Sequence, residues 1–153
     1  MKKKFSGFTI LEAIVVILFV GILASVAVYS LNITRASNRD AKRISDVAVI
    51  RAALSQYWLQ QATYPASVGV DIGRPGTGTN KLVVGGFVGA DSNVSPVYLD
   101  RVPVGPKSNE YYRYRGSSAG YSLRFVTERQ TIYGTQGRWY VHSTGIDQED
   151  AEK

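Results

Sequence analysis

The sequence predicts an α+β protein in which one long N-terminal helix packs on a small antiparallel β-sheet. Three observations support this fold class: a continuous apolar run near the N-terminus, helical spacing of apolar residues after it, and alternation of apolar and polar residues in the last third of the chain. A length of 153 residues suits one modest domain with one appended segment. The chain contains no cysteine, so disulfide bonds and thiolate ligands are excluded.

The first element is the apolar segment 8–31, in which only five side chains carry a polar atom. As a helix, its 24 residues extend about 36 Å, more than the roughly 30 Å of a bilayer's hydrocarbon core. The segment therefore predicts one membrane-spanning helix. Glu12 is its only ionisable carboxyl group, and a charge inside hydrocarbon costs a few kcal/mol unless it finds a partner. Glu12 is accordingly a candidate functional residue.

The helix is expected to continue beyond the apolar segment, because no proline occurs between Phe8 and Pro65. Apolar residues then recur at intervals of three or four, which predicts one continuous helix from Phe8 to about Gln61 whose second half is amphipathic. The expected core positions on this half of the helix are Ile44, Val47, Leu54 and Trp58.

Four strand-like segments follow in the C-terminal half of the chain, at 110–115, 121–128, 131–133 and 138–143. In the second of these, apolar and polar residues alternate, which is typical of an antiparallel sheet with one buried face. Residues 67–107 are rich in glycine, proline and serine and predict a loop-rich connection. The predicted division is a leader over 1–7, a hydrophobic transmembrane helix over 8–31, a head over 32–146 and an acidic, disordered tail over 147–153.

The N-terminus carries a motif of its own. Lys2, Lys3 and Lys4 precede Gly7-Phe8, and Glu12 follows four residues after Phe8. This pattern resembles the processing motif of type IV prepilins and of the major pseudopilins of type II secretion, and the resemblance covers roughly residues 1–65. It implies that a prepilin peptidase cuts after Gly7, that Phe8 becomes the N-methylated terminus, and that Glu12 serves filament assembly.

The resemblance also implies a function. It predicts a non-enzymatic structural subunit of a type IV pilus-like filament, with further copies of itself, the prepilin peptidase and the pilus or type II secretion assembly machinery as partners. The precursor would be a single-pass cytoplasmic membrane protein with its N-terminus in the cytoplasm, and the assembled filament would be extracytoplasmic or on the cell surface. Charge counting alone leaves this orientation open, because basic residues also follow the apolar segment. A type II secretion pseudopilin, a DNA-capturing competence pilin and a plain membrane-anchored domain are the alternatives.

The nucleic-acid alternative rests on three arginines interleaved with tyrosines. The formal net charge is +6, but removal of the leader lysines leaves 15 basic and 12 acidic residues, a weak excess for a nucleic-acid-binding protein. In a strand, Arg113 and Arg115 would share one face, and Arg124 lies in the next strand. These three residues are the candidate DNA contacts, while a tyrosine core with a solvated arginine face is the simpler interpretation.

No cofactor is predicted, with calcium as the one candidate metal. Major pseudopilins bind calcium near the C-terminal end of their sheet, and residues 143–147 loosely resemble that loop, with Asp91 or Asp100 as further oxygen donors. Two short segments resemble catalytic motifs but lack the surrounding elements that those motifs need. Residues 73–81 lack the lysine position and the following helix of a phosphate loop, and Gly-x-Ser-x-Gly at 116–120 precedes a strand, not a helix.

Overall fold

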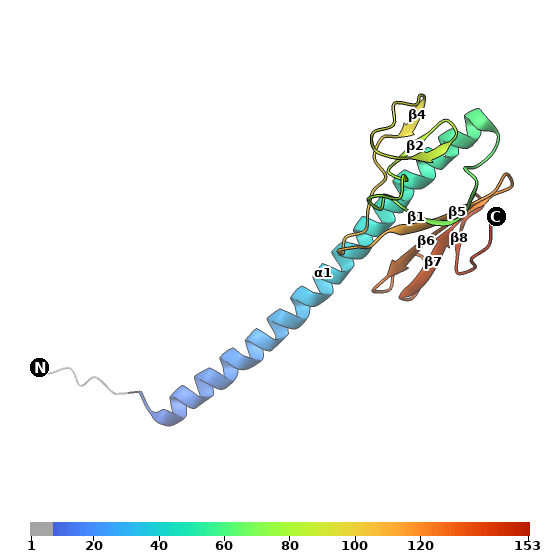
Figure 1. Ribbon diagram of the computed structural model, residues 1–153. Coiled ribbons are helices and arrows are strands. Elements are labelled where there is room, and N and C mark those ends of the chain that lie inside the picture. Colours follow the sequence, from blue (N-terminus) through green and yellow to red (C-terminus); the bar gives the residue numbers. More distant parts are fainter. Residues whose placement is uncertain (1–7) are drawn as a thin grey trace, which may run out of the picture. The chain divides into compact units, whose positions relative to one another are not determined.

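The computed structural model describes residues 8–153. The chain forms two compact units that divide between Ala36 and Ser37. One helix, α1 (Ile10–Gln61), belongs to both units, which confirms the predicted continuous helix. We call residues 37–153 the head; it contains the second half of α1 and all eight strands (Figure 1).

The strands of the head form two antiparallel sheets. The five-stranded sheet has the order β1-β5-β6-β7-β8, and the three-stranded sheet has the order β3-β2-β4. The bounds are β1 Ser67–Ile72, β2 Lys81–Val83, β3 Gly86–Val88, β4 Val97–Leu99, β5 Tyr112–Gly116, β6 Tyr121–Thr127, β7 Gly137–Val141 and β8 Ile146–Asp147. This is the α+β arrangement that the sequence predicts.

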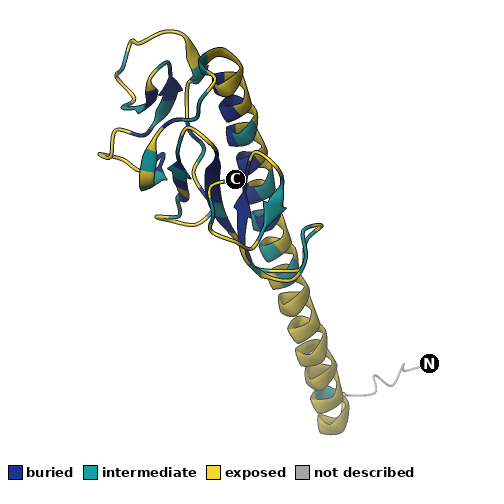
Figure 2. Ribbon diagram, turned by 90° about the vertical axis from the view of Figure 1, so that its right-hand side faces the viewer, coloured by how far each residue is buried: buried dark blue, intermediate teal, exposed yellow. Residues whose placement is uncertain are grey.

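The hydrophobic core lies between α1 and the inner face of the five-stranded sheet (Figure 2). The helix contributes Val47, Ile50, Ala53, Leu54 and Tyr57, which repeat every three or four residues and therefore share one face. The sheet contributes side chains that alternate along β5 and β6, with Tyr112, Tyr114, Tyr121, Leu123 and Phe125 buried. The prediction that Trp58 lies in the core is wrong. Trp58 is 45% exposed, because the buried face of the helix passes through its neighbour Tyr57.

Residues 67–107 are more ordered than the sequence predicts. The expected loop-rich connection contains β1 at the edge of the large sheet and all three strands of the small sheet. Leu82 and Val83 of β2 are fully buried against the core, which explains why so short an apolar run forms a strand. By contrast, the expected strand 131–133 is reduced to a single bridge between Thr131 and Gly134.

Residues 147–153 follow a defined course, contrary to the disorder expected from their charge. The segment begins in β8, and the carbonyl oxygen of Lys153 accepts hydrogen bonds from the backbone N–H (3.1 Å) and the hydroxyl (2.7 Å) of Ser143. Asp150 accepts a hydrogen bond from the Ser122 hydroxyl at 3.0 Å. The acidic side chains are matched by nearby cations, which composition alone does not reveal.

Candidate functional site

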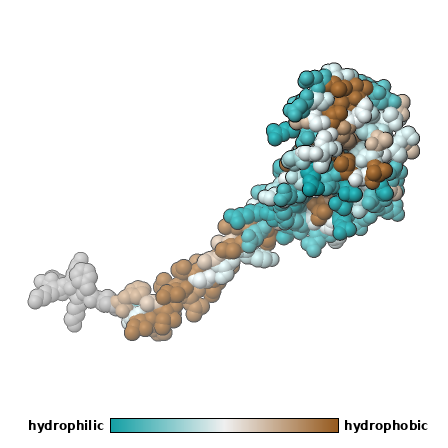
Figure 3. All heavy atoms as spheres, viewed as in Figure 1, coloured by the Kyte–Doolittle hydropathy of each residue, from teal (hydrophilic) through white to brown (hydrophobic). Residues whose placement is uncertain are grey.

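The apolar segment of α1 presents its large side chains to the surface. Between Phe8 and Leu31 these side chains are 45% (Val15) to 82% (Ile10) exposed, and hydrophobic residues predominate along this part of the helix in Figure 3. Within residues 8–153, α1 is the one helix long and apolar enough to cross a membrane. A soluble monomer rarely exposes so large an apolar surface, so the segment requires lipid or other subunits around it.

The predicted assembly residues stand at the start of this helix. The hydroxyl oxygen of Thr9 accepts a hydrogen bond from the backbone N–H of Glu12 at 3.2 Å, and the Thr9 carbonyl accepts one from Ala13 at 3.1 Å. Thr9 is therefore the N-cap, and Glu12 lies in the first turn, where the helix dipole favours a negative charge. Phe8 is 68% exposed, whereas Gly7 and the leader lie outside the described residues.

A network of charged side chains joins α1 to two loops within the head. The Arg43 guanidinium lies 2.7 Å from Asp40, measured from Nη1 to Oδ1. It also lies 2.5 Å from Glu110 (Nε to Oε1) and 2.8 Å from Glu128 (Nη1 to Oε1). Arg39 adds two hydrogen bonds to Glu128, at 2.9 and 2.7 Å. We call these five side chains the junction network.

Two side chains of the junction network are almost fully buried. Asp40 is 3% exposed and Arg43 is 2% exposed, so each needs an opposite charge to remain ionised. The Asp40 carboxylate also accepts the backbone N–H groups of Glu128 (2.9 Å) and Arg129 (2.9 Å). These contacts fix the start of the β6–β7 connection to α1.

The network also shifts protonation equilibria. The pKa of Glu128 is held well below its usual range, first by the hydrogen bonds from Arg39 and then, against the opposing effect of burial, by Arg43 and Lys107. Burial alone would lower the pKa of Arg43, but hydrogen bonds to Glu110, Glu128 and Asp40 raise it. Both groups are therefore charged at neutral pH.

The predicted arginine contacts share one face of the five-stranded sheet. Arg113 pairs in register with Arg124, and Arg115 pairs with Ser122. We call Arg113, Arg115 and Arg124 the arginine face. The alternating tyrosines of β5 are buried in the core, as the simpler interpretation predicts, so they present no ring for stacking on bases. The DNA contact thus remains a prediction without a stacking surface to support it.

One ammonium group, that of Lys153, links acidic side chains of the segment 146–153. Nζ of Lys153 lies 2.9 Å from the Asp147 carboxylate and also contacts that of Glu149. His142, which is fully buried, lies 3.0 Å from Asp147 through Nε2. The hydrogen bond from Lys153, followed by that from the Glu149 backbone N–H, lowers the pKa of Asp147 to about 2. We call this arrangement the Lys153 clasp.

The oxygen donors named for calcium do not gather into a site. Asp147 is engaged by Lys153 and His142, and the side chain of Asp100 pairs with Lys81 at 3.1 Å. In the part of the chain that the structure describes, no group of three His, Cys, Asp or Glu side chains is placed to hold a metal. A calcium ion takes six to eight oxygens, backbone carbonyls among them, so calcium binding stays a prediction.

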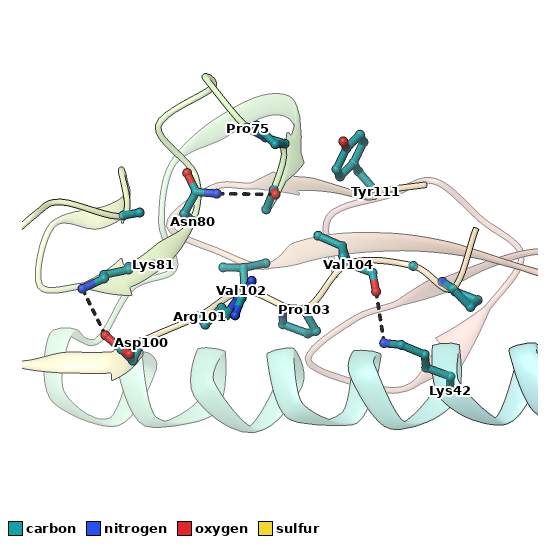
Figure 4. A pocket seen from close by; sticks show the side chains of 14 residues that line it. Lys42, Pro75, Asn80, Lys81, Asp100, Arg101, Val102, Pro103, Val104 and Tyr111 are labelled. Carbon is teal, nitrogen blue, oxygen red and sulfur yellow. Dashed lines mark hydrogen bonds and ion pairs between the residues drawn. The ribbon is translucent and has the colours of Figure 1, made fainter. Parts of the chain in front are cut away.

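One cleft of the head has a volume of about 820 Å³, and its polar side chains largely bond to neighbours (Figure 4). Lys42 donates to the carbonyl oxygen of Val104 at 3.1 Å, and Asn80 donates to Gly73 at 3.4 Å. The serine pattern at 116–120 forms the β5–β6 hairpin turn, closed by the Ser117 N–H on the Gly120 carbonyl at 2.9 Å. Neither place assembles a nucleophile with a base.

Sequence reasoning missed the junction network, although the sequence holds a signal for it. Asp40 and Arg43 continue the three-and-four spacing of Val47, Ile50 and Leu54 toward the N-terminus. Charged residues on a helix are usually taken as a solvated face. Their position in line with the apolar stripe indicates a buried ion pair instead.

These features define a class of protein. A capped, apolar helical segment followed without interruption by an amphipathic half that packs on an antiparallel sheet is the architecture of a pilin-like filament subunit, anchored in a membrane as a precursor.

Comparison with known proteins identifies the family. The chain is 32% identical to type II secretion system core protein G of Vibrio cholerae over 119 residues, 72% of this chain and 73% of that protein. It is 28% identical to the protein of the same name from Klebsiella michiganensis over 138 residues, which cover 87% and 92%. The match to the Aeromonas hydrophila protein is 39% over 66 residues and spans about half of that relative, 46%.

The chain therefore belongs to the type II secretion system core protein G family, the major pseudopilins. No protein-family profile matches it, and no solved structure matches it. Its function is that of a structural subunit of a pilin-like filament.

Proposed function

We propose that this chain is the repeating subunit of a type II secretion pseudopilus, with a non-enzymatic role. The observation that carries the proposal is the exposed apolar segment of α1, which must exchange lipid for the same segment of neighbouring copies. Membership of the core protein G family favours a secretion pseudopilus over a long surface pilus. Deleting the gene should abolish protein secretion without removing long surface fibres; loss of such fibres with secretion intact would overturn this choice.

The proposed precursor lies in the cytoplasmic membrane with its N-terminus in the cytoplasm. A prepilin peptidase would cut after Gly7, and Phe8 would then be methylated on its new terminal nitrogen. N-terminal mass spectrometry of the assembled protein tests both steps: the expected peptide begins at Phe8 and carries one added methyl group. A peptide that retains Met1–Gly7, or one that lacks the whole apolar segment, would contradict the proposal.

Glu12 is proposed to set the axial position of each subunit. Its carboxylate lies in the first helical turn, and in the filament the terminal ammonium of a neighbouring Phe8 would neutralise it. Pairing would replace two separately buried charges, each costing several kcal/mol, by one ion pair. The charge thus gives the apolar helices a preferred register that hydrophobic packing alone does not supply.

The Glu12→Ala variant tests this role. We expect filament cross-linking between subunits to fall about tenfold or more, since a loss of 1.4 kcal/mol or more per contact corresponds to that factor. The matched control is Ser25→Ala, which removes a hydroxyl bonded to its own helix at Gly21 and should assemble normally. Membrane insertion and unfolding of the head should be unchanged in both variants. Assembly of Glu12→Ala at the level of the unmodified chain would refute the role.

A further inference from the structure

A small polar pocket lies on the face of the five-stranded sheet opposite the tyrosine core. Its volume is about 120 Å³, and its lining includes Gly69, Arg113, Arg115, Ser122, Arg124 and Asp150. Because Arg113 and Arg124 are direct partners in the β5–β6 register, their side chains leave the sheet side by side. The pocket therefore brings three guanidinium groups from two strands together.

The neighbouring edge strand is shaped to admit one of these groups. The register of β1 shifts between Ser67 and Val70, and Gly69 within this bulge has a φ of 114°. A Cβ atom at position 69 would lie only 3.1 Å from Nη2 of Arg113. The backbone conformation favours glycine here, and a side chain at position 69 would also displace the Arg113 guanidinium by a few tenths of an ångström.

The arginines of the pocket are only loosely paired. Arg113 lies 3.6 Å from the Asp71 carboxylate, and Arg115 lies 3.8 Å from Asp150 and 3.5 Å from Glu152. These separations exceed the 2.7–2.9 Å typical of charge-assisted hydrogen bonds. For Arg124, no carboxylate within residues 8–153 lies within 4.0 Å. Most of the guanidinium N–H donors therefore remain available to a ligand.

Charge and size indicate the class of ligand. The lining holds three guanidinium groups and the one carboxylate of Asp150, and the carboxylates of Asp71 and Glu152 lie just outside it, 3.6 Å from Arg113 and 3.5 Å from Arg115. We infer that this pocket binds a phosphate monoester group, with Arg113 and Arg124 as facing ligands and Arg115 as the third. A monoester carries nearly two negative charges at neutral pH and offers three oxygens to the planar guanidinium forks.

The same features distinguish a monoester from a nucleic-acid backbone. A phosphodiester carries one negative charge, and single-strand binding relies on exposed aromatic rings, whereas Tyr112 and Tyr114 of β5 are buried. Asp150 accepts the Ser122 hydroxyl at 3.0 Å and occupies part of the lining. It would compete with the ligand, so its removal should strengthen binding.

The test is calorimetric titration of the full chain in non-ionic detergent micelles at low salt. The titrants are glycerol 3-phosphate, inorganic phosphate and a short DNA duplex. We expect glycerol 3-phosphate and inorganic phosphate to bind at one site per chain, with affinity about tenfold lower at pH 5 than at pH 7.5, because the second phosphate pKa is about 6. Binding of inorganic phosphate alone would overturn the ester assignment, and binding of DNA alone would overturn the inference.

Variants separate the site from general effects of charge. Arg124→Gln should weaken glycerol 3-phosphate binding about tenfold or more. Arg138→Gln, an exposed arginine in β7 that does not line the pocket, is the matched control and should bind normally. Asp150→Asn should bind more tightly, which a merely structural role of this residue would not produce. Equal losses in Arg124→Gln and Arg138→Gln, or weaker binding by Asp150→Asn, would refute the site. None of these outcomes depends on filament assembly.

Discussion

The head contains two groups of arginines that are used in opposite ways. In the junction network, Arg43 is 2% exposed and meets three carboxylates at 2.5–2.8 Å. On the arginine face, the side chains of Arg113 and Arg115 are 47% and 42% exposed, and their nearest carboxylates lie at 3.5–3.8 Å. Buried, closely bonded charges fix a structure, whereas exposed and distant pairs contribute little stability and leave donors free for a ligand.

The largest expected effect comes from breaking the junction network. Arg43→Ala would leave Asp40, Glu110 and Glu128 without their shared cation, and removing one partner of a buried pair typically costs about 3–5 kcal/mol. The free energy of unfolding, measured by urea titration of the full chain in micelles and followed by tryptophan fluorescence, should fall by that amount. A loss below about 1 kcal/mol would show that water or rearrangement replaces the network.

Arg138→Ala provides the matched control for this measurement. Arg138 is exposed, and no carboxylate within residues 8–153 lies within ion-pair distance of it. Its removal should change the free energy of unfolding by no more than about 0.5 kcal/mol. A comparable loss in both variants would mean that net charge, and not the buried network, controls stability.

The difference between the two groups also explains what sequence could predict. The helix, its apolar first half and strands β5, β6 and β7 follow from local periodicity, which a sequence displays directly. The arginine face follows from the same alternation. Two partners of Arg43, Glu110 and Glu128, lie 67 and 85 residues away in loops, so no local pattern identifies them.

The remaining errors have a similar cause. Strands β2, β3 and β4 have three residues each, too few to show a period, and they form because Leu82 is buried by distant parts of the chain. The acidic composition of residues 147–153 predicts disorder. The course of this segment depends on hydrogen bonds from Ser122 to Asp150 and from Ser143 to Lys153, whose partners lie 28 and 10 residues apart in the chain.

A second prediction concerns the pH dependence of stability, to which Glu128 of the junction network contributes. The pKa of Glu128 is lower in the folded state than in the unfolded state, where it is about 4.3. The unfolded chain therefore binds more protons in acid, so stability is fully present above about pH 4.3 and falls as the pH drops below it. Asp147, with a pKa lowered to about 2, acts in the same direction.

Urea midpoints at pH 3, 5 and 7 test this dependence. The midpoint should be similar at pH 7 and 5 and lower at pH 3. Glu128→Gln should be less stable at neutral pH, since it loses the pairing with Arg39 and Arg43, but its further decline toward pH 3 should be shallower. A parallel decline in both proteins would assign the acid sensitivity to other carboxyl groups.

The smallest expected effect concerns the Lys153 clasp. Its exposure lies between that of Arg43 and that of the arginine face. Its side chains are 36–40% exposed at Lys153 and Asp147, yet the ammonium lies at hydrogen-bonding distance from the carboxylate. Lys153→Ala should therefore lower the urea midpoint by much less than Arg43→Ala. Because the ammonium already neutralises Asp147 and Glu149, adding calcium chloride or a chelator to the unmodified chain should leave the midpoint unchanged. A rise of the urea midpoint on calcium addition, reversed by the chelator, would contradict this expectation. It would show that the segment 146–153 rearranges to bind the metal, and that calcium and not Lys153 holds the segment in place.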